Sequence, residues 1–291
     1  MDIHPPHPGW LAWVRGGSSA SARPILIALL AIGLVLTLSS SSAESQETRD
    51  QLITVSTRPR VTESVVVVRP PMKPAATIVV LVGGLGKLDL TPRGLPRDAV
   101  GPLIKRRERL AGLGFVVAFV DAPSDRLAEG LIGFRTSREH AADIGGVIAR
   151  LRHDDPAPLW LIGSSMGTVS AASVTARLGK DGPDGLILIS SVTHNHPAMR
   201  ESLADVPLES ITVPTLVIHH RQDPCEITPY AEVSALPQRL GKARRVELVT
   251  VEGGPPPRGL PCGPESPHAF SGMEDTLIDR LASWIKRTPV H

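Results

Sequence analysis

The sequence predicts an α/β fold: a doubly wound, mostly parallel sheet flanked by helices. Three observations predict it. Short, continuous runs of apolar and β-branched residues recur along the chain, as in strands buried on both faces of a parallel sheet. Segments with helical periodicity separate most of these runs, and such alternation gives parallel strands with right-handed crossovers. Clusters of Pro and Gly follow several predicted strands, at the sheet edge where open α/β sheets bind ligands.

The expected strands begin with two runs, residues 52–57 and 61–68, that flank Arg58-Pro59-Arg60. This pattern predicts an antiparallel hairpin that enters the sheet. The later runs carry no internal turn signal and are expected to be parallel strands. They are residues 77–82, 115–120, 159–162, 186–189, 215–219 and 245–251.

Helices are expected between these strands, at residues 102–113, 136–151, 167–178, 228–240 and 271–286. The second begins with a capping sequence that places Glu139 in the first turn. Residues 192–214, between two predicted strands, are too few for a folded cap domain. The sequence therefore predicts a minimal lid and an open site, at which esters of short acyl chains react faster than esters of long ones.

An apolar run at residues 24–38 follows Arg15 and Arg23 and precedes a serine-rich stretch that ends at Ala43. This arrangement predicts that residues 1–43 are a secretory signal peptide. An uncleaved membrane anchor is the alternative, although the run is short for a span of about 20 residues. Residues 44–291 are expected to form a single domain in a secreted or periplasmic protein, or in one anchored to the membrane outside the cytoplasm.

The charge balance of the chain predicts no nucleic-acid partner. Lys and Arg number 31 against 29 Asp and Glu, and aromatic residues are only 3% of the sequence, so neither a basic surface nor a base-stacking platform is indicated. The chain has two cysteines, Cys225 and Cys262. In an exported protein these are expected to form one disulfide, with two unpaired thiols as the alternative.

The motif Gly163-Ser164-Ser165-Met166-Gly167 has the form G-x-S-x-G and lies between a predicted strand and a predicted helix. In that context a tight turn presents the serine as a nucleophile, and the backbone N–H of the following residue, Met166, stabilises an oxyanion. The glycines are needed where side chains would strike the neighbouring strand and helix. The alternative is a structural serine in a tight turn.

A serine nucleophile needs a histidine base and a carboxylate that orients the base. Asp223 follows a predicted strand, and His268 precedes the last predicted helix. Only the terminal His291 competes with His268 downstream of Asp223. Asp121, at the end of another predicted strand, is the alternative acid.

Residues 60–287 resemble the α/β-hydrolase superfamily of the serine esterase and lipase type, in which the triad follows the order serine, acid, histidine. The resemblance implies Ser165, Asp223 and His268 as the triad. It also implies an oxyanion loop at residues 82–86, where the amide of Gly84 or Leu85 would act together with that of Met166. The implied activity is hydrolysis of a carboxylic ester or related acyl bond of a small molecule, without a cofactor.

Other interpretations of these residues are weaker. Residues 83–88 lack the spacing of a phosphate-binding loop, and no metal is expected at the histidines because their spacing matches no recognised ligand set. These histidines are His194, His196, His219 and His220. A catalytically inactive binding or scaffold protein on the same fold is the alternative function. A Cys225–Cys262 bridge would tie the loop of Asp223 to the loop of His268.

Overall fold

The computed structural model describes residues 50–197 and 199–290. The predicted signal peptide, residues 1–43, lies outside the described residues. Among the described residues, no helix has the length and apolar character needed to cross a membrane.

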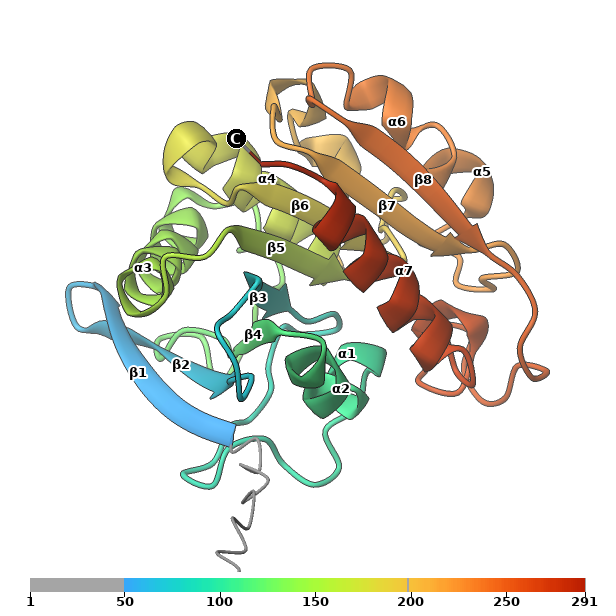
Figure 1. The fold of residues 1–291 in the computed structure, drawn as a ribbon. Coiled ribbons are helices and arrows are strands. Elements are labelled where there is room, and N and C mark those ends of the chain that lie inside the picture. Colours follow the sequence, from blue (N-terminus) through green and yellow to red (C-terminus); the bar gives the residue numbers. More distant parts are fainter. Residues whose placement is uncertain (1–49, 198, 291) are drawn as a thin grey trace, which may run out of the picture. The chain divides into compact units, whose positions relative to one another are not determined.

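The described residues form one eight-stranded sheet with the order β1-β2-β4-β3-β5-β6-β7-β8 (Figure 1). β1 (Asp50–Arg58) and β2 (Val61–Val68) form the predicted antiparallel hairpin, and β2 pairs antiparallel with β4. All later pairs are parallel. The later strands are β3 (Ala76–Leu81), β4 (Phe115–Val120), β5 (Leu159–Ser164), β6 (Gly185–Ile189), β7 (Thr215–His220) and β8 (Val246–Val251). The predicted doubly wound, mostly parallel sheet is confirmed.

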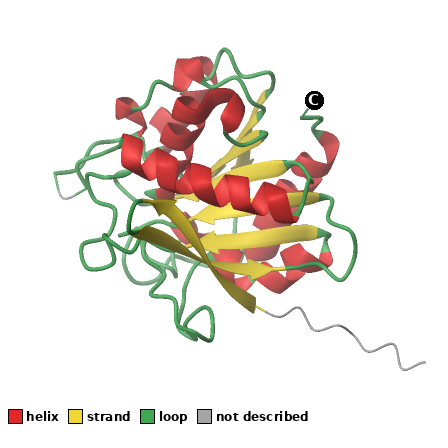
Figure 2. Ribbon diagram, turned by 90° about the vertical axis from the view of Figure 1, so that its left-hand side faces the viewer, coloured by secondary structure: helices red, strands yellow, loops and turns green. Residues whose placement is uncertain are grey.

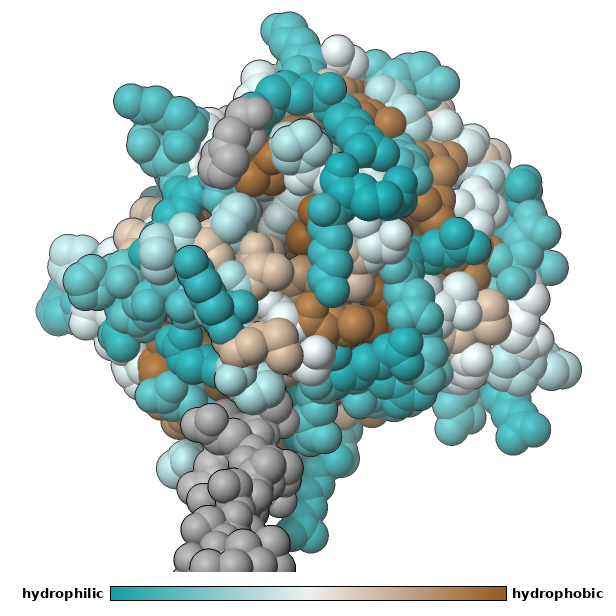
Figure 3. All heavy atoms as spheres, in the orientation of Figure 1, coloured by the Kyte–Doolittle hydropathy of each residue, from teal (hydrophilic) through white to brown (hydrophobic). Residues whose placement is uncertain are grey.

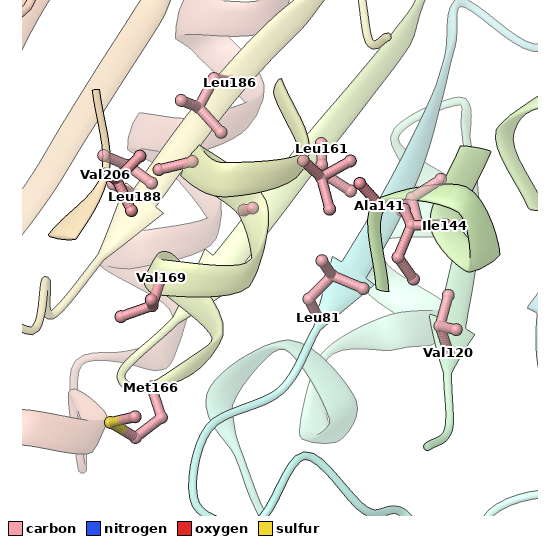
Figure 4. Packing of buried hydrophobic residues seen from close by; sticks show 14 of the residues in the cluster. Leu81, Val120, Ala141, Ile144, Leu161, Met166, Val169, Leu186, Leu188 and Val206 are labelled. Atoms are coloured by element: carbon pink, nitrogen blue, oxygen red, sulfur yellow. The ribbon is translucent and has the colours of Figure 1, made fainter. Parts of the chain in front are cut away.

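Helices cover both faces of the sheet (Figure 2). One face packs against α3 (Arg138–Asp154), α4 (Gly167–Leu178), α5 (Tyr230–Val233) and α6 (Leu236–Arg239). The other packs against α1 (Pro102–Lys105), α2 (Arg107–Gly112) and α7 (Glu274–Arg287). Figure 4 shows the first of these cores, where Leu81 and Leu161 of the sheet lie near Ile144 of α3. Every residue of β3 and β4 is buried, which explains why Thr77 is their one polar residue.

Two of the predicted helices are wrong as single elements. The segment 102–113 divides into α1 and α2 at Arg106, and the segment 228–240 divides into α5 and α6. Pro237 lies in the first turn of α6 and has no N–H to continue a helix that began earlier. α7 begins at Glu274, later than predicted, because Gly272 has φ +71°, outside the helical region. α4 matches its predicted range, and Ser137 caps α3 by accepting from the N–H of His140.

Short 3-10 turns complete the described chain at Gly179–Asp181, Leu203–Asp205, Leu208–Ser210 and Pro267–Ala269.

On the side of the molecule drawn in Figure 3, hydrophilic residues cover most of the surface and hydrophobic residues form smaller patches between them. The buried face of α7, which includes Leu277, Leu281 and Trp284, is turned towards the sheet.

Candidate active site

Ser165 occupies the turn between β5 and α4 with φ +53°, a left-handed conformation that a non-glycine residue seldom adopts. Glycine is required on both sides of it. A Cβ at Gly163 would lie 2.3 Å from the carbonyl oxygen of Gly167, and a Cβ at Gly167 would lie 2.0 Å from that of Leu81. The motif therefore folds as a sharp strand-to-helix turn, with the Met166 amide immediately after the serine.

His268 and Asp223 meet Ser165 from two other loops. Asp223 follows β7, and His268 lies in the 3-10 turn between β8 and α7. His268 Nε2 is 3.0 Å from Ser165 Oγ, and His268 Nδ1 is 2.9 Å from Asp223 Oδ2. Because an ionised carboxylate only accepts, Nδ1 donates to Asp223, and Nε2 is left to accept from the serine hydroxyl. The arrangement can remove a proton from Ser165.

The side chain of Asp223 is fully buried, and both of its carboxylate oxygens accept hydrogen bonds. Its Oδ1 accepts from the N–H of Cys225 at 2.9 Å, and its Oδ2 accepts from the hydroxyl of Thr228 at 2.9 Å. His219 Nε2 lies 3.5 Å from the same Oδ2. Burial lowers the pKa of His219 to about 4, so this imidazole is neutral at pH 7. These contacts fix the carboxylate against His268.

Sequence reasoning did not find Thr228 or His219 as partners of Asp223. The sequence predicts that Thr228 begins a helix, and it indicates His219 only as a strand residue or a metal ligand. Asp223 accepts from the N–H two residues on, as an aspartate in a turn does, but no local pattern marks the hydroxyl of Thr228 five residues away. His219 precedes Asp223 by four residues, and the turn after β7 brings the two side chains together.

The predicted oxyanion loop packs directly against Ser165. A Cβ at Gly83 would lie 2.8 Å from Ser165 Cβ and 3.4 Å from its Oγ, so only glycine allows this approach. Gly84 has φ +55°. Its carbonyl accepts from Arg135 Nη2 at 2.8 Å, and the carbonyl of Leu85 accepts from the N–H of Leu131 at 2.8 Å. Hydrogen bonds to these two carbonyl groups thus fix the path of the loop.

Arg135 is a third residue that sequence reasoning missed. Its side chain is fully buried and also donates to Ser170 Oγ of α4 at 2.9 Å, so it links the predicted oxyanion loop to the helix that follows Ser165. Burial lowers its pKa to about 10, which still leaves the guanidinium charged at pH 7. No local pattern could identify it, because its partner is a backbone carbonyl 51 residues away.

Asp121, the alternative acid, serves a different set of partners. Its carboxylate accepts from the N–H groups of Leu88, Leu90 and Ala122 at 2.7 to 2.9 Å. It therefore anchors the loop that follows β3, while His268 contacts Asp223.

Cys225 and Cys262 form a disulfide, as expected. Cys225 is buried two residues after Asp223, and Cys262 lies on the exposed loop that leads to His268. The bridge thus joins the loop that carries Asp223 to the loop that carries His268.

A pocket of about 620 Å³ opens beside Ser165 and His268. Its walls come from the loop after β3 and from residues 262–264 and 268–269. Leu85 and Val100 are exposed at its lining, and Lys87 forms an ion pair with Asp89 at 3.2 Å. Such a pocket can hold a small molecule with both apolar and polar parts.

The segment between β6 and β7, expected as a minimal lid, does not line this pocket in the described residues. Its apolar side chains Leu203, Val206 and Leu208 are buried in the core beside α4. Its Glu201 accepts from the N–H groups of Arg135 and Thr136. The segment therefore packs in the core and against the residues that precede α3.

The histidines considered as metal ligands are spread over separate contacts. His194 Nδ1 lies 3.3 Å from Glu232, and His196 Nε2 lies 3.5 Å from Glu226. His220 Nε2 contacts the carbonyl of Gly253 at 2.9 Å. Across residues 50–197 and 199–290, no group of three or more His, Cys, Asp or Glu side chains is arranged to hold a metal ion.

No protein-family model matches the sequence, and no curated protein matches it significantly. Solved structures do match the fold. An esterase of Pyrococcus furiosus aligns with a TM-score of 0.57 and 16% identity over 82% of this chain and 93% of its own. A thermostable carboxyl esterase of Bacillus coagulans aligns with a TM-score of 0.56 and 16% identity, over 81% and 98% of the two chains. A dienelactone hydrolase of Anabaena variabilis aligns with a TM-score of 0.53 and 13% identity, over 81% of this chain and 96% of its own. At these identities the likeness establishes the α/β-hydrolase fold.

Proposed function

We propose that this protein is a serine hydrolase that cleaves a carboxylic ester or a related acyl bond of a small molecule. The observation that carries the proposal is the chain of contacts from Ser165 Oγ through the imidazole of His268 to Asp223 Oδ2, at 3.0 and 2.9 Å. The fold adds support, since the solved structures that share it include esterases and a dienelactone hydrolase.

In the proposed mechanism Asp223 holds His268 in the tautomer whose Nε2 accepts a proton. His268 takes the proton of Ser165 as Oγ attacks the acyl carbon. The amide of Met166, with that of Gly84 or Leu85, stabilises the oxyanion of the tetrahedral intermediate. The imidazolium then protonates the departing alcohol, and in the second half of the cycle His268 activates water to release the acid from Ser165.

The same proposal includes a location outside the cytoplasm. Its support is the Cys225–Cys262 disulfide, a bond typical of oxidising compartments, together with the leader-like sequence of residues 1–43.

Labelling with a fluorophosphonate probe tests the function, because the probe reacts with an activated serine. We expect one labelled site, lost in Ser165→Ala, with kcat for a p-nitrophenyl ester lowered by about 10³-fold or more and the melting temperature nearly unchanged. Ser173→Ala, in α4 and outside the lining of the pocket, is the control and should keep its label. A well-folded wild-type protein that takes no label would instead support an inactive binding or scaffold protein.

A further inference from the structure

A small apolar cavity branches from the pocket beside Ser165. Its volume is about 60 Å³, against about 620 Å³ for the main pocket, and the two share most of the lining of the smaller one, including Gly83 and Ser164. Three residues line only the smaller space, which we call the side cavity. They are Val80 of β3 and Leu103 and Ile104 of α1, and they are 1%, 3% and 5% exposed.

The chemistry proposed for Ser165 assigns a part of the substrate to each space. The histidine that accepts the serine proton later protonates the leaving oxygen, so the alcohol must lie beside His268. His268 and residues 262–264 line the main pocket, and none of them is among the described residues that line the side cavity. The acyl chain stays on Ser165 after the alcohol leaves. The side cavity, lined by the neighbouring Ser164 and by Gly83, is a space near Ser165 that His268 does not line.

The two spaces also differ in polarity. The walls of the side cavity carry aliphatic side chains, with Ser164 as the one polar side chain among the described lining residues. The main pocket includes Lys87, Asp89 and Asp98. An apolar chain therefore fits the side cavity, and a bulkier, polar group fits the main pocket.

The size of the side cavity limits the chain. A volume of about 60 Å³ holds only a few water-sized groups, which corresponds to an acyl chain of about two to four carbons. We infer that the side cavity is the acyl subsite and that the substrates are esters of short aliphatic acids with bulkier, polar alcohols. This inference rests on the proposed function.

Kinetics with p-nitrophenyl esters of two to twelve acyl carbons test the inference. We expect kcat/KM to be highest at two to four carbons and to fall at eight by about 10-fold or more, the scale on which a tight apolar pocket discriminates methylene groups. Ile104→Ala and Leu103→Ala enlarge the side cavity and should raise the octanoate-to-butyrate ratio of kcat/KM by about 10-fold. Val80→Ile narrows the side cavity and should lower kcat/KM for the butyrate ester relative to that for the acetate ester.

Leu110→Ala is the matched control. Leu110 of α2 is buried in the same core without lining either pocket, so its variant loses similar core packing but should keep the wild-type chain-length profile. A wild-type optimum at eight or more carbons would overturn the inference. So would unchanged ratios in every folded variant among Ile104→Ala, Leu103→Ala and Val80→Ile.

Fluorophosphonate labelling distinguishes failure of the acyl subsite from failure of the proposed function. If the protein labels at Ser165 and hydrolyses esters with a different chain-length profile, only the acyl subsite is contradicted. If the folded protein takes no label, both the proposed function and the acyl subsite are contradicted.

Discussion

Asp223 and Asp121 both follow parallel strands but differ in what their oxygens contact. Asp223 Oδ2 lies 2.9 Å from His268 Nδ1, whereas Asp121 accepts from the amides of Leu88, Leu90 and Ala122. We expect Asp223→Asn to lower kcat by about 10³- to 10⁴-fold, because an amide no longer holds His268 in the tautomer that accepts the serine proton. Steady-state kinetics and a melting curve measure the effect on rate and on stability.

Asp121→Asn is the matched comparison. Replacing a carboxylate oxygen by NH₂ leaves a loop amide without its acceptor, so the expected effect is a loss of about 1–3 kcal/mol in the free energy of unfolding. Its effect on kcat should be much smaller than that of Asp223→Asn. The reverse order of the two rate effects would assign the acid to Asp121.

At the scale of elements, the disulfide joins the loop after β7 to the loop after β8. The second of these loops is exposed over residues 252–262 and rich in Gly and Pro, so few side-chain contacts define its path. The bridge spans 37 positions of sequence, for which chain entropy gives about 4 kcal/mol of stabilisation. We expect reduction, or the double variant Cys225→Ser/Cys262→Ser, to lower the melting temperature and also kcat, because His268 would lose its fixed position.

The double variant also serves as the control for the reductant, which should have no further effect on it. Thiol titration of the native protein reports whether the bridge is present. Unchanged kcat after complete reduction would show that the bridge contributes to stability alone.

At the scale of the whole molecule, a buried carboxyl group makes stability depend on pH. Glu63 of β2 is fully buried, and neither of its carboxyl oxygens has a hydrogen-bond partner among the described residues. Burial, followed by the charges of Asp143 and Asp121, raises its pKa from 4.5 to about 9, and Arg58 opposes this rise. The folded protein therefore keeps a proton on Glu63 at pH 7, which the unfolded chain releases.

Stability should consequently fall as pH rises from about 4.5 to about 9, since the unfolded state binds fewer protons across that range. Glu63→Gln removes this contribution, so its gain in melting temperature over wild type should grow with pH. Glu209→Gln, at an exposed position, is the control and should leave the pH profile unchanged. A constant difference between wild type and Glu63→Gln from pH 5 to pH 9 would contradict a protonated Glu63.

Local patterns were sufficient for the sheet and for the position of the serine. Runs of apolar residues mark β3 to β7, because strands buried on both faces leave little room for polar residues. β1 and β8 are only partly buried, and their runs mix apolar with polar residues. The motif at residues 163–167 identified the turn because a Cβ on either glycine would collide with backbone. Helix lengths were less predictable. The segments 102–113 and 228–240 have helical composition, but each divides into two short helices.

Contacts between distant parts of the chain required the three-dimensional structure. The order of the strands, with β4 between β2 and β3, depends on pairing energies that no single segment contains. The separate tasks of Asp223 and Asp121 depend on which loops meet, since both have the same local setting at a strand end. Arg135 and the side cavity near Ile104 are likewise products of packing. The partner of Arg135 is a backbone carbonyl, and the side cavity is an empty volume between side chains. Neither produces a periodic pattern in the sequence.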